Sequence, residues 1–434
     1  FINIKVDKEE RPDLDKIYQL AYQLMNGQGG GWPLTAFLTP EDHLPIFVGT
    51  YFPPVASYGR ISFKDLLTRI IELNEKKAIE IQNNKVNLLS ALRDVTEISS
   101  DGNIGKFSEE PLKHAQQRLQ KMFDVENGGF GVEPKFPHPD YLEFLLRYYK
   151  ANSPISPEAI AALNHVTFTL TKMAKSGLYD HIGGGFFRYS VDKAWEIPHF
   201  EKMLYDNAQL LSIYAEAYAI QSNELFATVI DETAGWLLRE MQSPQGGFYA
   251  TLDADSGHVE GKYYYWDYDE VKTILTAEEF AVIRLGFGLA NIANFKSHWH
   301  LQQAYTITEM AEHLNVSEKQ VLELLQIAKL KLFSVRQQKE YPARNEKMIT
   351  AWNALAIKGL CQAGLYLQRP EYIAAAEKAL ANLRKTVWHD KQLYANSQNQ
   401  KPGSLAFIDD YAFLLESLLL LLQAHWQSEN LEFA

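Results

Sequence analysis

The most constraining feature of the sequence is a Gly-Gly-Phe segment that recurs between amphipathic stretches. Copies lie at residues 128–130, 184–186 and 246–248, so their first glycines are 56 and then 62 residues apart. A fourth, degenerate copy at residues 389–394 has lost its glycines. A period of this length corresponds to one helical hairpin plus a long loop. Such hairpins must stack side by side, because none can bury its own apolar face.

The length of the repeat region predicts a ring. Six hairpins of about 55 residues would need about 330 residues, and residues 109–434 number 326. We therefore predict an all-α (α/α)6 toroid over residues 109–434. Apolar residues with helical spacing predict its helices. The expected helices cover residues 109–123, 141–150, 159–175, 202–220, 226–241, 317–333, 349–366, 372–387 and 409–423.

The first 98 residues have a different, α/β pattern. Apolar and polar residues alternate from Phe1 to Val6, which is typical of a strand, and Pro12 suits the first turn of a helix. Residues 34–38 and 46–51 read as a β-hairpin, and residues 63–98 as helix. The polar residues 99–108 are the expected linker to the toroid. A chain that opens inside a strand and without Met is expected to be a truncated piece.

Composition and motifs exclude several function classes. The net charge of −12 argues against a general nucleic-acid binder. No apolar run reaches the roughly 20 residues of a membrane helix. The single cysteine, Cys361, excludes an internal disulfide framework and an intact Cys-x-x-Cys centre. Histidines lack metal-ligand spacing, and no phosphate-binding P-loop occurs. We expect a cytoplasmic protein with no metal, cofactor, nucleic-acid or membrane partner.

Long motifs resemble one known family. Two of them are Tyr179 to Val191 (YDHIGGGFFRYSV) and Trp195 to Gln209 (WEIPHFEKMLYDNAQ). The other matching stretches are residues 4–13, 30–34, 49–53, 131–137, 247–256 and 409–412. The chain resembles the thioredoxin-domain-containing family that includes YyaL and spermatogenesis-associated protein 20. The resemblance implies a DUF255-type thioredoxin-like domain, followed by a toroid similar to six-hairpin glycosidases and N-acylglucosamine 2-epimerases.

The chain departs from that family at both ends. The family carries a Cys-x-x-Cys segment upstream of the opening strand, and this chain has none, so the resemblance implies an incomplete thioredoxin-like domain here. The family also continues past residues 409–412 through further helices, so the toroid is expected to be open at its C-terminal side. Asn345-Glu346 stands where relatives tend to carry two aspartates.

The strongest candidate site lies at residues 198–206. We expect Pro198 to begin a helix with His199 and Glu201 in its first turn and Asp206 on the stripe of His199. A helix N-terminus disfavours the imidazolium and would keep His199 available as a base. Tyr205 is expected beside Glu201 as a substrate contact. The alternative is that His199 and Glu201 only cap the helix.

His181 and Arg188 flank three glycines. This segment suits close approach to a ligand, which Arg188 would bind through a carboxylate, phosphate or hydroxyl group. The alternative is a tight turn in which Asp180 pairs with Arg188.

Asp253 and Asp255 are the best paired carboxylates. In an extended segment they would point the same way, about 6.6 to 7 Å apart, which glycoside hydrolysis can use. The alternative is a loop in which they accept backbone N–H groups.

Further residues complete the predicted substrate site. One of Asp409 and Asp410 is an ordinary helix cap, and the other would face the interior with Tyr411 beside it. Trp195 and Trp352 offer aromatic faces to a sugar, and Asn353 lies beside Trp352. Helix capping and core packing are the alternatives for this set.

These residues support three hypotheses. The first is a carbohydrate-active protein with an acid–base site in the mouth of the toroid; a pair of histidines would indicate an epimerase or isomerase, and two acids a glycosidase. The second is a non-catalytic scaffold that binds a protein partner through its thioredoxin-like domain. The third, thiol redox chemistry, lacks its cysteines here. We expect a small, sugar-like ligand.

Overall fold

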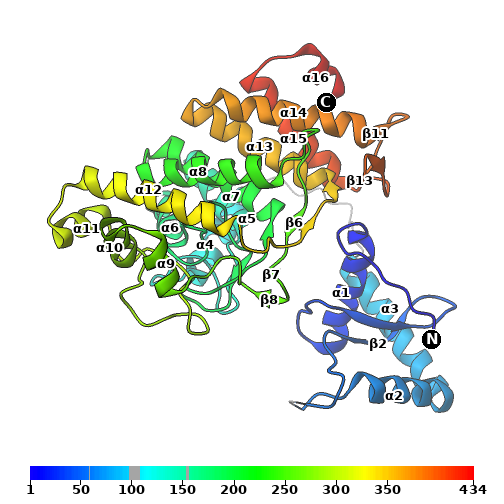
Figure 1. Ribbon diagram of the computed structural model, residues 1–434. Coiled ribbons are helices and arrows are strands. Elements are labelled where there is room, and N and C mark those ends of the chain that lie inside the picture. The colour runs from blue at the N-terminus through cyan, green and yellow to red at the C-terminus, as the bar shows by residue number, and fades with distance from the viewer. Residues whose placement is uncertain (58, 97–107, 153–155) are drawn as a thin grey trace. The chain divides into compact units, whose positions relative to one another are not determined.

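The computed structural model describes residues 1–57, 59–96, 108–152 and 156–434, and the chain divides into two compact units, residues 1–107 and 108–434 (Figure 1). The expected linker at residues 99–108 lies outside the described residues except for Ser108. No described helix is both long and apolar enough to cross a membrane.

The first unit contains α1 (Pro12–Asn26), the antiparallel hairpin β1 (Thr35–Leu38) and β2 (Pro45–Gly49), and the helices α2 (Phe63–Lys76) and α3 (Ala78–Thr96). The predicted hairpin and the helix starting at Pro12 are confirmed. The predicted strand Phe1–Val6 is wrong, because residues 1–7 form no regular structure. Ile2 and Ile4 are exposed there, and alternation alone makes no strand without a neighbouring strand to bond.

The second unit is a toroid-type array of helical hairpins in two layers. Its inner helices pack in chain order, and each is followed by an outer helix (Figure 1). After α4 (Glu110–Met122), the hairpins are α5 (Pro139–Asn152) with α6 (Pro157–Lys175), α7 (Leu204–Ile220) with α8 (Glu224–Trp236), α13 (Thr350–Leu367) with α14 (Pro370–Thr386), and α15 (Ile408–Ala424) with α16 (Ser428–Phe433).

The inner helices α7 and α13 form the centre of the core. Nearly all their side chains are buried, including Tyr214, Leu360 and Cys361. The two helices approach so closely at Gly359 that an added Cβ would lie 2.6 Å from the carbonyl oxygen of Ala208. Glycine is therefore required at that crossing.

The number of hairpins differs from the prediction. The described residues supply four, not six, because four other helices form a separate cluster between the second and third hairpins (Figure 1). This inserted cluster contains α9 (Tyr268–Ile274), α10 (Ala277–Gly286), α11 (Ile307–Leu314) and α12 (Glu318–Arg336). It has its own apolar core around Trp266, Val282 and Leu332. Length alone cannot distinguish such helices from toroid helices.

The Gly-Gly-Phe segments are tight turns that join an outer helix to the next inner helix. Gly184 and Gly185 have φ of 76° and 81°, a backbone conformation that suits glycine. Asn207 of α7 accepts a hydrogen bond from the Phe186 N–H at 2.6 Å. Asn353 of α13 repeats this bond with the Phe248 N–H at 2.6 Å. The turns thereby fix the inner-helix N-termini at one end of the second unit.

We call that end the mouth; its loops comprise residues 184–203, 246–260 and 344–349. Short strands line it in three-stranded and two-stranded ladders. One sheet joins β5 (Lys202–Met203), β6 (Thr251–Leu252) and β9 (Arg344–Asn345), and another joins β10 (Met348–Ile349), β13 (Asn396–Gln398) and β14 (Lys401–Pro402). The two-stranded ladders are β3 (Tyr189–Ser190) with β4 (Pro198–His199), β7 (Asp255–Ser256) with β8 (Val259–Glu260), and β11 (Trp388–His389) with β12 (Gln392–Leu393).

Candidate active site

His199 lies on a strand and not on a helix. The expectation that Pro198 begins a helix is wrong: residues 198–199 pair with Tyr189 and Ser190, and α7 begins only at Leu204. His199 therefore does not share a helical stripe with Asp206. Sheet pairing with a distant segment overrides the local helix-start signal of Pro198.

The imidazole of His199 is held on two sides. Its Nδ1 lies 2.7 Å from Oε1 of Glu260, and its ring stacks on Tyr189 with centroids 5.0 Å apart. Because a carboxylate can only accept, Nδ1 carries the proton and Nε2 keeps its lone pair when the ring is neutral. The side chain of His199 is 29 % exposed.

Glu201 and Arg188 form an ion pair next to that lone pair. Oε2 of Glu201 is 2.7 Å from Nη1 of Arg188 and 3.8 Å from Nε2 of His199. Burial favours the neutral form of Arg188, but the nearby Tyr205 and Glu201 outweigh it, so the pKa of Arg188 is raised. Arg188 is a permanent cation here. It does not pair with Asp180, which was the alternative from sequence.

Tyr205 and Asp206 bring the first turn of α7 to the same cluster. Burial raises the pKa of Tyr205 well above its usual range. Asp206 is buried and lies close enough to Arg188 to raise its pKa. Trp352 at the start of α13 meets Tyr205 edge to face, with ring centroids 4.7 Å apart. The aromatic rings of Tyr205 and Trp352 therefore lie beside the Arg188–Glu201 ion pair.

Asp253 and Asp255 are exposed on the hairpin that carries Glu260. Asp255 lies directly opposite Glu260 in the β7–β8 ladder. Oδ1 of Asp253 accepts the Asp255 N–H at 3.1 Å, as in the loop alternative. The ladder therefore places Asp255 next to Glu260, the partner of His199, and Asp253 just before this hairpin.

Three predicted residues do not join the cluster. Nε2 of His181 donates to the carbonyl of Ser176 at 2.9 Å, and burial lowers the pKa of His181 to about 3. Trp195 is fully buried and donates to the Asn127 carbonyl at 3.0 Å. Asn353 is fully buried and binds the Phe248 turn. Each has a structural role in the core.

Of the two acids at the start of α15, Asp410 is the helix cap. The other acid, which was expected to face the interior, is Asp409, and it is exposed. Asp410 is buried and accepts from the N–H groups of Phe407 at 2.8 Å and Ala351 at 3.0 Å, so it caps two helix starts. Burial raises the pKa of Asp410 to about 6 despite these bonds. The residues left over, Asp409 and Tyr411, are exposed.

Glu260, the partner of His199, is the residue that sequence reasoning underrated. From its position five residues beyond Asp255 it reads only as a weaker third acid, and it lies 61 positions from His199. The signal that could have found it is the Gly257 turn, because a hairpin centred there places residue 260 across from residue 255. Tyr189 was missed for the same reason, since its contact depends on strand pairing.

The described residues also bear on metal binding and on thiol chemistry. No group of three His, Cys, Asp or Glu side chains there could hold a metal ion. Cys361 is buried in α13, and burial raises the pKa of its thiol to about 12. A thiol with so high a pKa is a poor nucleophile at neutral pH.

Comparison with known proteins places the chain among relatives of similar sequence. Residues 1–93 match the family model Thioredox_DsbH, described as a protein of unknown function, DUF255. Spermatogenesis-associated protein 20 of Mus musculus is 33 % identical over 473 residues, which cover all of this chain and 59 % of that protein. The whole chain is thus similar to spermatogenesis-associated protein 20. The uncharacterised protein B0495.5 of Caenorhabditis elegans is 34 % identical and is covered over 63 % of its length.

The chain thus spans about three fifths of the relatives that it matches. Solved structures resemble it more remotely. A sugar epimerase from a ruminal bacterium is 11 % identical with a TM-score of 0.28, covering 71 % of this chain and 98 % of that one. A family 76 α-mannanase of Bacteroides thetaiotaomicron is 11 % identical with a TM-score of 0.33, covering 76 % and 82 %. Similarity at these scores supports no statement about the chemistry of this chain.

Proposed function

We propose that the mouth of the second unit catalyses proton transfer on a carbohydrate, with His199 as the base. The observation that carries this proposal is the 2.7 Å bond from Nδ1 of His199 to Glu260, which leaves Nε2 beside the Glu201–Arg188 pair. Glu260 is a positioning residue that fixes the tautomer and stabilises the imidazolium. Trp352 and Tyr205 offer aromatic faces to a sugar ring.

The positions of the two predicted histidines, His199 at the mouth and His181 in the core, favour aldose–ketose isomerisation within that class. Nε2 of His199 would remove the C2 proton of an open-chain aldose, exchange it with a proton from solvent and deliver that proton to C1, while the O2 hydroxyl proton moves to O1. One base on one face is enough for that exchange. Epimerisation at C2 needs a second proton donor on the opposite face, and the other predicted histidine, His181, lies in the core.

Arg188 is suited to bind the oxygens of the enediolate that forms between these steps. Its Nη1 holds Glu201, and its Nε is buried without a hydrogen-bond partner among the described residues. A guanidinium aimed at developing negative charge stabilises it most strongly away from bulk water. Glu201 is already engaged in the ion pair with Arg188, which disfavours a glycosidase built on His199 and Glu201.

The test is incubation of the full-length protein with a panel of aldoses and ketoses, with products resolved by ion chromatography, beside a panel of aryl glycosides. Interconversion that is lost in His199→Asn supports the proposal. Glycoside hydrolysis that is lost in Asp253→Asn or Asp255→Asn would replace it with a hydrolase. No conversion in either panel would favour the scaffold hypothesis, in which the thioredoxin-like unit binds a protein partner.

A further inference from the structure

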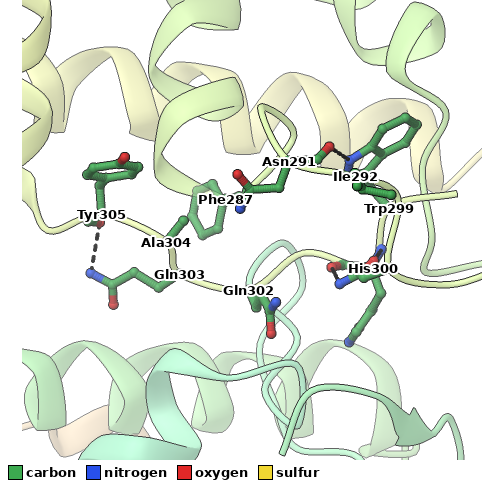
Figure 2. A pocket seen from close by; sticks show the side chains of 11 residues that line it. Phe287, Asn291, Ile292, Trp299, His300, Gln302, Gln303, Ala304 and Tyr305 are labelled. Carbon is green, nitrogen blue, oxygen red and sulfur yellow. Dashed lines mark hydrogen bonds between the residues drawn. The ribbon is translucent and has the colours of Figure 1, made fainter.

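A cavity lies in the inserted cluster and shares no residue with the mouth cluster. It opens between the end of α10 and the segment 288–305 and has a volume of about 320 Å³. Small-molecule sites in proteins occupy about 300 to 1,000 Å³. Figure 2 shows its lining side chains, which come from two stretches of chain, residues 287–294 and 299–305.

Carboxamide groups supply the polar part of this cavity. Asn291 and Gln302 make no side-chain hydrogen bond to any described residue. Gln303 uses only its Nε2, which donates to the Tyr305 carbonyl at 3.2 Å (Figure 2). Each carboxamide offers both donors and acceptors. Such groups match hydroxyls, which also donate and accept.

The remaining lining is uncharged and includes three aromatic side chains. Phe287, Trp299 and Tyr305 contribute rings. The one titratable imidazole, His300, is buried and donates from Nε2 to the Gly177 carbonyl at 2.6 Å. Burial lowers the pKa of His300 to about 4, so it is neutral at physiological pH. With no charge in the lining, an ionised ligand would lose its hydration without compensation.

We propose that this cavity binds a neutral, hydroxyl-rich ring of monosaccharide size. The carboxamides would bond the hydroxyls, and the rings would cover the C–H face of the ligand. Nothing in this assignment depends on His199 or on the proposed reaction, because the two sites have no residue in common.

The test uses isothermal titration calorimetry of the full-length protein with D-glucose and D-mannose. Wild type, Gln302→Ala, Arg188→Ala and the matched control Gln338→Ala are titrated in parallel. Gln338 is an exposed glutamine of the same cluster that lies outside the cavity. We expect Gln302→Ala to raise the Kd of the cavity by about 10-fold, as for one lost hydrogen bond, and Gln338→Ala to leave that binding unchanged.

Three results would overturn the assignment. The first is that neither hexose binds. The second is that binding is lost in Arg188→Ala and kept in Gln302→Ala, which would place the ligand at the mouth alone. The third is that charged D-glucuronate or planar adenosine binds the cavity at least as tightly as the hexoses. Binding that only Gln302→Ala weakens supports the cavity even if the proposed reaction fails. The Gln302 side chain makes no hydrogen bond to a described residue. We therefore expect the Gln302→Ala variant to unfold at the same temperature as wild type.

Discussion

Two imidazoles of the second unit have nearly the same immediate surroundings. His199 bonds Glu260 through Nδ1 at 2.7 Å and stacks on Tyr189. His298 bonds Asp267 through Nδ1 at 2.7 Å and stacks on Tyr265, with centroids 4.3 Å apart. Their side chains are 29 % and 30 % exposed.

The two histidines differ in what faces Nε2. At His199 a second carboxylate, Glu201, lies 3.8 Å away and is itself paired with Arg188. At His298 no ion-pair partner other than Asp267 lies within 4 Å among the described side chains. A carboxylate and a tyrosine ring are therefore a general way to fix a surface imidazole. Only the added charges next to Nε2 indicate chemistry.

The largest effect is expected from removing the two imidazoles in turn. We predict that His199→Asn lowers the isomerisation rate by about 10²- to 10⁴-fold, as for a lost general base. His298→Asn should leave the rate unchanged, because that histidine has no second charge beside it. Initial rates of aldose–ketose conversion measure both. Equal losses in the two variants would remove the distinction between the sites.

Removing the positioning carboxylates sharpens the comparison. Glu260→Gln keeps the shape of the side chain but no longer fixes the proton on Nδ1 of His199, and we expect a loss of about 10²-fold in kcat. The matched variant Asp267→Asn should have no effect. The split between kcat and KM separates this role from a structural one, because a misplaced base lowers kcat and leaves KM unchanged.

Replacing the cation next to His199 should have a smaller effect. Arg188→Lys keeps the charge but loses the planar fork that can hold Glu201 and a substrate oxygen together. We expect KM to rise by about 10-fold, the effect of one lost charge-assisted hydrogen bond. Steady-state kinetics of Arg188→Lys against wild type measure it. An unchanged KM would mean that Arg188 only holds Glu201.

The smallest effect is expected from a third histidine, the buried His181. It concerns the free energy of unfolding and not the reaction rate. Its pKa is lowered to about 3 by burial, against about 6.5 in an unfolded chain. Between these values the unfolded chain binds a proton and the folded chain does not. The free energy of unfolding should therefore fall as pH drops below about 6.5, by up to about 1.4 kcal/mol per pH unit from this group.

Urea unfolding of wild type, His181→Gln and His199→Asn between pH 7.5 and 4.5 measures this contribution. His181→Gln should flatten the dependence, and His199→Asn should leave it steep, since that imidazole is partly exposed. A slope that His181→Gln does not change would contradict a neutral, buried His181.

The helices could be predicted from sequence because their signals are local. Apolar spacing and the Gly-Gly-Phe turns located α5 to α8 and α13 to α15 to within a few residues. The inserted cluster could not be separated from the toroid, because its helices are amphipathic too. Only tertiary packing shows that Trp266 and Leu332 belong to a different core.

The site was only partly predictable for a related reason. His199, Glu201 and Arg188 lie in conspicuous motifs, and the structure brings them together. Glu260 depends on the register of a short hairpin, which the sequence does not fix strongly. His181 and Asn353 stand in equally conspicuous motifs but serve the turns of the repeat, and sequence alone cannot separate the two uses.

The central claim is that His199, and not the similar His298, moves a proton between solvent and a sugar. Solvent deuterium incorporation tests it most directly, with the full-length protein, an aldose that it converts and ¹H NMR of the product in ²H₂O. We predict deuterium at C1 of the ketose product for wild type and His298→Asn, and none for His199→Asn. Incorporation that persists in His199→Asn, or its absence in wild type, would contradict the claim.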